Sequence, residues 1–137
     1  EKLIKLLNTK ENDDFNILKD EALIGNKIQT NKLLSETEID NDKKVFYINS
    51  INQRLLKLLD LKEISKTKNI ENAINEIKPP IFWKDKPIIK KQLENWSRSK
   101  IKDLIIKINK TEVFLKKNSS ISLMLISNFI YETSERN

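Results

Sequence analysis

Glycine occurs once in this chain of 137 residues, at Gly25, and this scarcity constrains the fold more than any other feature. A domain built from β-strands needs many tight turns, in which glycine adopts positive φ without strain. Apolar residues instead recur at three- and four-residue steps, and no stretch alternates apolar and polar residues for more than a few positions. The sequence therefore predicts an all-α domain of about six or seven helices.

Residues 78–96 divide the predicted helices into two sets, one before and one after this stretch. Pro79 and Pro80 cannot continue a helix, so the preceding helix must end there. Asp85 stands where a helix N-cap is expected, and Pro87 falls within the first turn of the next helix. That helix carries a single apolar face, formed by Ile89, Leu93 and Trp96.

Helical segments are expected on both sides of this corner. Before it, a short helix over residues 1–8 and a polar turn at 10–14 precede helices over about 15–24, 26–37, 42–65 and 69–77. Gly25 is expected to end the second of these helices, and Asn69 to cap the last. After the corner, Ser97 is expected to cap a long helix, and Ser119 or Ser120 a final one.

The final helix is apolar around most of its circumference, and it includes Met124, Phe129 and Ile130. A helix of this kind must be covered on several sides. It is therefore either the central helix of this domain or a helix that docks against another subunit.

The residue types needed for several kinds of chemistry are absent. The chain has no cysteine and no histidine, which excludes disulfides, thiolate or imidazole metal ligands, and histidine general bases. One glycine cannot form a phosphate-binding loop. The paired carboxylates lie in polar turns or at helix starts, where caps are expected, so we predict no catalytic, metal or cofactor site. No apolar run is long enough to cross a bilayer, and we expect no membrane association and a cytoplasmic location.

Charge is unevenly distributed along the chain. The net charge of +6 divides into −1 over residues 1–61 and +7 over residues 62–137. The basic half could face phosphate or an acidic partner, although AT-rich codon usage would also explain the bias towards Lys, Asn and Ile. A small helical module that binds nucleic acid is therefore an alternative, with its cations around Trp83 and Trp96: Lys84, Lys86, Lys90, Lys91 and Arg98.

Phe82, Trp83 and Trp96 are the aromatic group that stands out in the sequence. Three interpretations are open. The rings could anchor a helical corner in the core, provide hot spots in a protein interface, or stack on bases among the lysines.

The same stretch resembles the delta subunit of bacterial DNA polymerase III, a clamp-loader subunit. The resemblance lies in Pro-Pro-Ile-Phe-Trp-Lys-Asp-Lys at residues 79–86 and Gln-Leu-Glu-Asn-Trp-Ser at 92–97. Weaker similarity includes residues 20–26 and the pair Glu112 and Lys116, so that the match covers about residues 15–131.

This resemblance implies a fold and a role. Residues 1–12 would end a preceding lid domain, and residues 13–137 would form the C-terminal helical collar. The collar assembles with gamma/tau and delta-prime subunits into a ring that loads the sliding clamp onto primed DNA. Delta contacts the clamp through an N-terminal domain that this sequence does not include. The chain would therefore be a non-catalytic part of a DNA-directed DNA polymerase holoenzyme.

The resemblance also implies where partners would bind. Candidate subunit-interface residues or structural anchors are Phe82, Trp83, Trp96, Met124, Phe129 and Ile130. We expect the exposed part of the last helix to face a neighbouring collar.

Overall fold

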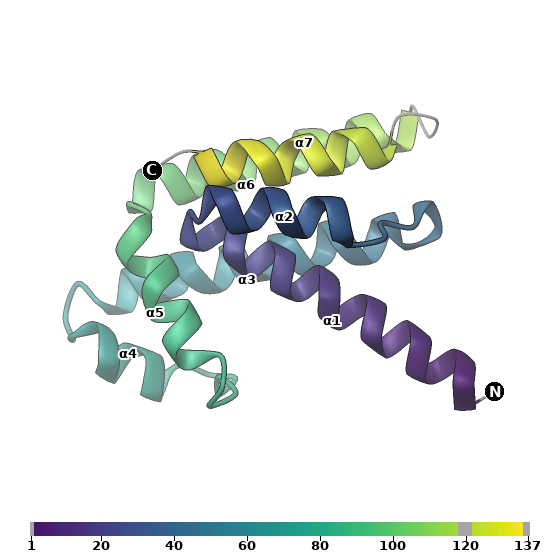
Figure 1. Ribbon diagram of the computed structural model, residues 1–137. Coiled ribbons are helices and arrows are strands. Elements are labelled where there is room, and N and C mark those ends of the chain that lie inside the picture. The colour runs from purple at the N-terminus through teal and green to yellow at the C-terminus, as the bar shows by residue number, and fades with distance from the viewer. Residues whose placement is uncertain (1, 118–121, 136–137) are drawn as a thin grey trace.

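The computed structural model describes residues 2–117 and 122–135 of the chain. Within these residues it contains seven α-helices, one short 3-10 helix and no β-strand, which confirms the predicted all-α fold. The elements, labelled in Figure 1 where there is room, are α1 (Lys2–Ile24), α2 (Lys27–Glu36), η1 (Asn41–Lys43), α3 (Lys44–Ile64), α4 (Ile70–Glu76), α5 (Lys86–Asn95), α6 (Arg98–Lys117) and α7 (Ser122–Glu135).

Helix α1 runs without interruption through residues 10–14, where the sequence predicted a polar turn. The prediction was wrong because this segment contains neither Gly nor Pro, and its Asn and Asp residues each cost at most about 0.7 kcal/mol relative to Ala. The two predicted helices are therefore one helix of 23 residues. The domain boundary expected after residue 12 lies inside it. In Figure 1 the N-terminal part of α1 extends away from the other helices.

Most helix ends lie at the residues that the sequence predicted. Gly25 follows α1 with φ of 89°, the left-handed conformation that favours glycine. The side chains of Asn26 and Asn69 accept hydrogen bonds from backbone N–H groups in the first turns of α2 and α4, and Ser97 does the same for α6. Asp85 occupies the N-cap position of α5, but its carboxylate makes no capping hydrogen bond there.

The helices before and after the corner do not form separate sets, contrary to the expectation. Helix α3 packs against α6, α5 packs against α1, and α7 packs against α1 and α2. The buried apolar side chains of all these elements except α2 belong to one cluster, and partly buried leucines of α2 pack against it. The expectation failed because proline pairs end a helix locally but do not decide which apolar faces meet.

Helix α7 is covered by several elements of its own chain. It contacts α1, α2, α3 and α6, and Figure 1 shows it running along α2. Phe129 and Ile130 are buried, whereas Met124 is 58% exposed. This burial favours the first of the two alternatives, a helix within the domain, and leaves Met124 at the surface. The predicted cap at residues 119–120 lies outside the described residues.

Candidate functional site

The three aromatic residues singled out in the sequence lie in two different environments. Trp96 is 1% exposed and belongs to the core. Phe82 and Trp83 are 59% and 67% exposed, with ring centroids 5.9 Å apart. The Nζ atom of Lys84 lies 5.4 Å from the Trp83 ring, a cation–π arrangement. The core-anchor interpretation therefore holds for Trp96 and is wrong for Phe82 and Trp83, which form an exposed aromatic pair.

The indole of Trp96 joins the corner to the end of α1. Its Nε1–H donates a hydrogen bond of 2.7 Å to the backbone carbonyl of Leu23. The side-chain amide of Asn95 donates to the same carbonyl at 3.1 Å. A carbonyl in the last turn of a helix has no partner within that helix. Residues more than 70 positions later therefore satisfy the C-terminal end of α1.

A buried polar network connects α1, α3 and α5 beside this contact. The Arg54 guanidinium donates to the Asp20 carboxylate at 2.6 Å and to Gln92 Oε1 at 3.1 Å. The Gln92 amide in turn donates to the backbone carbonyl and the carboxylate of Asp20, at 3.2 and 3.3 Å. Gln92 is fully buried, and the two charged side chains are 13% and 14% exposed. This network fixes the position of α5, and with it the corner that precedes α5.

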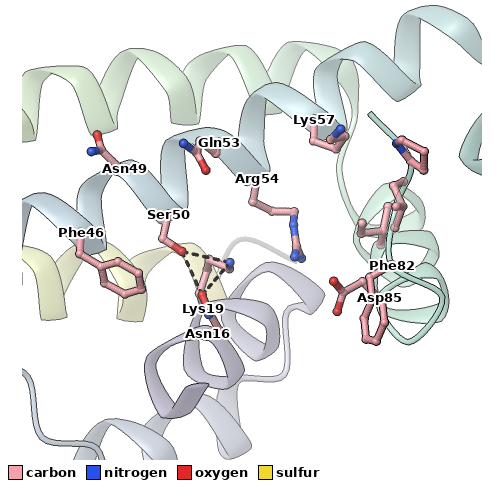
Figure 2. A pocket seen from close by; sticks show the side chains of 13 residues that line it. Asn16, Lys19, Phe46, Asn49, Ser50, Gln53, Arg54, Lys57, Phe82 and Asp85 are labelled. Atoms are coloured by element: carbon pink, nitrogen blue, oxygen red, sulfur yellow. Dashed lines mark hydrogen bonds between the residues drawn. The ribbon is translucent and has the colours of Figure 1, made fainter. Parts of the chain in front are cut away.

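An open groove lies next to the network, between α1, α3 and the corner, with a volume of about 620 Å³ (Figure 2). Its floor holds Lys19, whose Nζ donates to Asn16 Oδ1 at 3.1 Å and to Ser50 Oγ at 3.2 Å. Asp85 enters from the corner and points towards Arg54 in Figure 2. The groove thus combines buried cationic groups with an open mouth, and it is the candidate binding site of this domain.

Lys19 is 6% exposed, and both acceptors of its ammonium group are neutral. The pKa of this group is lowered from 10.5 to about 8, chiefly by burial and also by the nearby Arg54 charge. The carboxylates of Asp20 and Asp85 act in the opposite direction. Such a group carries its charge at neutral pH at an energetic cost, because desolvation disfavours the charged form.

We expect Lys19→Met to change the pH dependence of stability. The folded pKa lies below the unfolded value, so between about pH 8 and 10.5 the unfolded chain binds more protons, and rising pH stabilises the fold. The variant loses this response. Between pH 7 and 9.5, the unfolding free energy of the wild type should therefore rise by about 2 kcal/mol relative to that of the variant. Urea denaturation at both pH values measures this change.

Lys32→Met provides a control for this measurement, because Lys32 is an exposed residue of α2. Its stability difference from the wild type should stay constant over the same pH range. A constant difference for Lys19→Met as well would contradict the assigned burial of a charged Lys19.

The five cations proposed for nucleic-acid binding do not form one free surface. Lys90 pairs with Glu71 at 2.9 Å, Arg98 pairs with Glu63, and Lys86 donates to Asn75 Oδ1 at 2.9 Å. Trp96 is buried and cannot stack on a base. What remains exposed at the corner is Trp83 with Lys84 beside it, together with Lys91 further along α5.

Sequence reasoning identified some of these site residues and missed others. Gln92 and Trp96 belong to the motif that carried the resemblance. Asp20 lay at the start of the weaker similarity without a role, and neither Lys19 nor Arg54 was singled out. An arginine within an apolar helical stripe was the available signal for the network, since Arg54 lies three residues after Ile51 and four before Leu58 on α3.

The described part of the chain defines an all-α domain with a polar groove and an exposed aromatic pair. No family model matches the chain, and neither a curated protein nor a solved structure shows significant similarity to it. Within residues 2–117 and 122–135, no acidic cluster is suited to hold a metal ion. None of the helices described combines the length and the apolar character that a bilayer crossing requires.

Proposed function

We propose that this chain is the C-terminal collar domain of a DNA polymerase III delta subunit, a non-catalytic domain that assembles the clamp loader in the cytoplasm. Its partners would be the collars of gamma/tau and delta-prime subunits. Contact with the sliding clamp would belong to the family's N-terminal domain, and contact with primed DNA to the whole assembly.

The observation that carries this proposal is that the motif at residues 79–97 contains both buried and exposed residues. Gln92 and Trp96 are buried and hold α5 against α1. Phe82 and Trp83 precede them and are exposed on the corner that these contacts fix. Aromatic residues are enriched in protein interfaces, and tryptophan in particular is enriched among their hot spots. An oligomerisation domain needs buried residues that hold its helices together and exposed residues that contact a partner, and this motif supplies both.

Further apolar side chains at the surface are consistent with lateral contacts. Ile106 and Val113 of α6 and Met124 of α7 are each more than half exposed. Phe129 and Ile130 are core residues, so charged substitutions there would test folding and not assembly. Met124, which is exposed, is therefore the α7 position at which a substitution would test assembly.

We expect the double substitution Phe82→Ala/Trp83→Ala to prevent assembly without unfolding the domain. Truncating two interface hot spots should weaken association by about a thousandfold, because each typically costs about 2 kcal/mol or more and every 1.4 kcal/mol is tenfold. Analytical ultracentrifugation of the full-length subunit mixed with gamma/tau and delta-prime measures assembly, and circular dichroism measures folding.

Ile28→Ala serves as the matched control, because Ile28 is an 85% exposed apolar residue on a different element, α2. This variant should assemble normally. A double variant that still forms the ring with gamma/tau and delta-prime at wild-type concentrations would refute the role of the corner. Failure of the unaltered subunit to join gamma/tau and delta-prime would refute the proposed function itself.

Nucleic-acid binding is a second candidate, favoured by the exposed Trp83 and the lysine beside it. Such pairs bind single strands by stacking and by phosphate contacts. A salt titration of single-stranded and duplex DNA separates the candidates. Affinity tighter than micromolar with a steep salt dependence would favour direct binding, and negligible binding by the isolated chain would favour the collar.

A further inference from the structure

The groove between α1, α3 and the corner has aromatic side chains at its two ends and polar side chains between them. Figure 2 shows Phe46 at one end and Phe82 at the other, with Asn49, Gln53 and Lys57 along the α3 side. Apolar side chains at both ends suit the side chains of a ligand. The polar groups between them suit a ligand with its own hydrogen-bonding groups.

Among the residues that the structure describes, three cationic side chains line the groove with a single carboxylate, Asp85 at the corner, so the lining keeps a net positive charge. Lys19 is 6% exposed and contacts two neutral oxygens, which leaves one of its three N–H groups available. The other buried cation, Arg54, is already paired with Asp20 and bonded to Gln92. Lys57 donates to the carbonyl of Pro79 at 3.3 Å and is also cationic. A carboxylate brought to Lys19 would give the ammonium the opposite charge that buried cations normally have.

The α3 wall can recognise the backbone of an extended chain. Asn49 and Gln53 are exposed and stand one helical turn apart on the groove side. Each carboxamide offers both a donor and an acceptor, which matches the N–H and C=O groups of a peptide. A phosphodiester backbone offers acceptors only, so it would use the two amide NH₂ groups and make no use of the amide oxygens.

We propose that this groove binds an extended peptide segment of a partner protein that carries a carboxylate next to an apolar side chain. The carboxylate would contact Lys19 Nζ, the peptide backbone would contact Asn49 and Gln53, and the apolar side chain would pack on Phe46 or Phe82. This site does not depend on the chain being a clamp-loader domain.

Two fluorescein-labelled pools of hexapeptides test the proposal by fluorescence anisotropy. Both pools carry leucine or phenylalanine beside a central position, which is aspartate in one pool and asparagine in the other. The aspartate pool should bind the chain at micromolar concentrations, at least tenfold more tightly than the asparagine pool. Lys19→Met should abolish this preference, and Lys32→Met should preserve it.

A second measurement places the ligand in the groove. In lysine-labelled protein, the side-chain NMR signal of Lys19 should shift when the aspartate pool is added, and that of Lys32 should stay in place. Equal binding of the two pools, or an unchanged preference in Lys19→Met, would overturn the proposal. Displacement of the peptides by an equimolar single-stranded oligonucleotide would also overturn it, because the groove would then be a nucleic-acid site. Assembly with gamma/tau and delta-prime would be unaffected by any of these results.

Discussion

Replacing Trp96 with alanine should lower the free energy of unfolding by about 4 kcal/mol, the largest effect that we expect from a single side chain. The indole is 1% exposed and packs in the core, and removing a large buried aromatic side chain typically costs about 3–5 kcal/mol. The substitution also leaves the Leu23 carbonyl with only the Asn95 amide as a side-chain donor. Urea denaturation followed by far-ultraviolet circular dichroism measures the loss.

Two further variants separate the causes of this effect. Trp96→Phe keeps most of the packing and removes the 2.7 Å hydrogen bond, so it should cost about 1–2 kcal/mol from the lost bond and the smaller ring. Trp83→Ala is the matched control, because Trp83 is 67% exposed, and it should change stability by less than about 0.5 kcal/mol. If Trp83→Ala were as destabilising as Trp96→Ala, the assignment of one tryptophan to the core and the other to the surface would be wrong.

Arg54→Met is expected to have the second largest effect, a loss of about 3 kcal/mol, at the lower end of the cost of breaking a buried pair because both side chains keep some exposure. The substitution leaves the Asp20 carboxylate, which is 14% exposed, without its cation, and it removes the donor to Gln92 Oε1. Breaking a buried ion pair by removing one partner is costly because the remaining charge stays desolvated. Denaturation by urea is the suitable measurement, because guanidinium chloride is a salt and would screen the ion pair.

A double-mutant cycle tests whether the cost arises from the unpaired charge. Arg54→Met/Asp20→Asn should be more stable than Arg54→Met alone, because the neutral amide no longer requires a cation. Arg98→Met gives the comparison at a surface pair, since Arg98 binds Glu63 with both side chains more than 40% exposed. That substitution should cost no more than about 1 kcal/mol. Equal losses for Arg54→Met and Arg98→Met would contradict a special role for the network.

Much of the fold could be predicted from local sequence signals. Gly25 follows α1 in a left-handed conformation, and the side chains of Asn69 and Ser97 cap α4 and α6. Each of these effects lies within four residues of a helix end. Trp96 was correctly predicted to join the apolar surface of Ile89 and Leu93, although it lies at the C-cap position, just after α5. These features depend on neighbouring residues, which a single sequence displays directly.

The features that failed depend on contacts between distant segments. Asp20, Arg54 and Gln92 are separated by 34 and 38 positions, and periodicity does not show that they meet. Exposure of Phe82 and Trp83 could not be predicted either, because an aromatic residue in an irregular segment has no face defined by a repeat. The groove is formed by α1, α3 and the corner, which are distant from one another in the sequence, so no local motif indicated it.

The contact between Trp96 and Leu23 has a consequence for the synthesis of this protein. Helices α1 and α2 leave the ribosome well before their covering helices α5 and α7, the last of which follows about 100 residues later, or about 5–20 s at usual rates of translation. During that interval α1 can pack only on α2 and α3, so part of the apolar surface of α1 and α2 stays uncovered. The packing of α1 and α2 is therefore completed only after α7 has been synthesised.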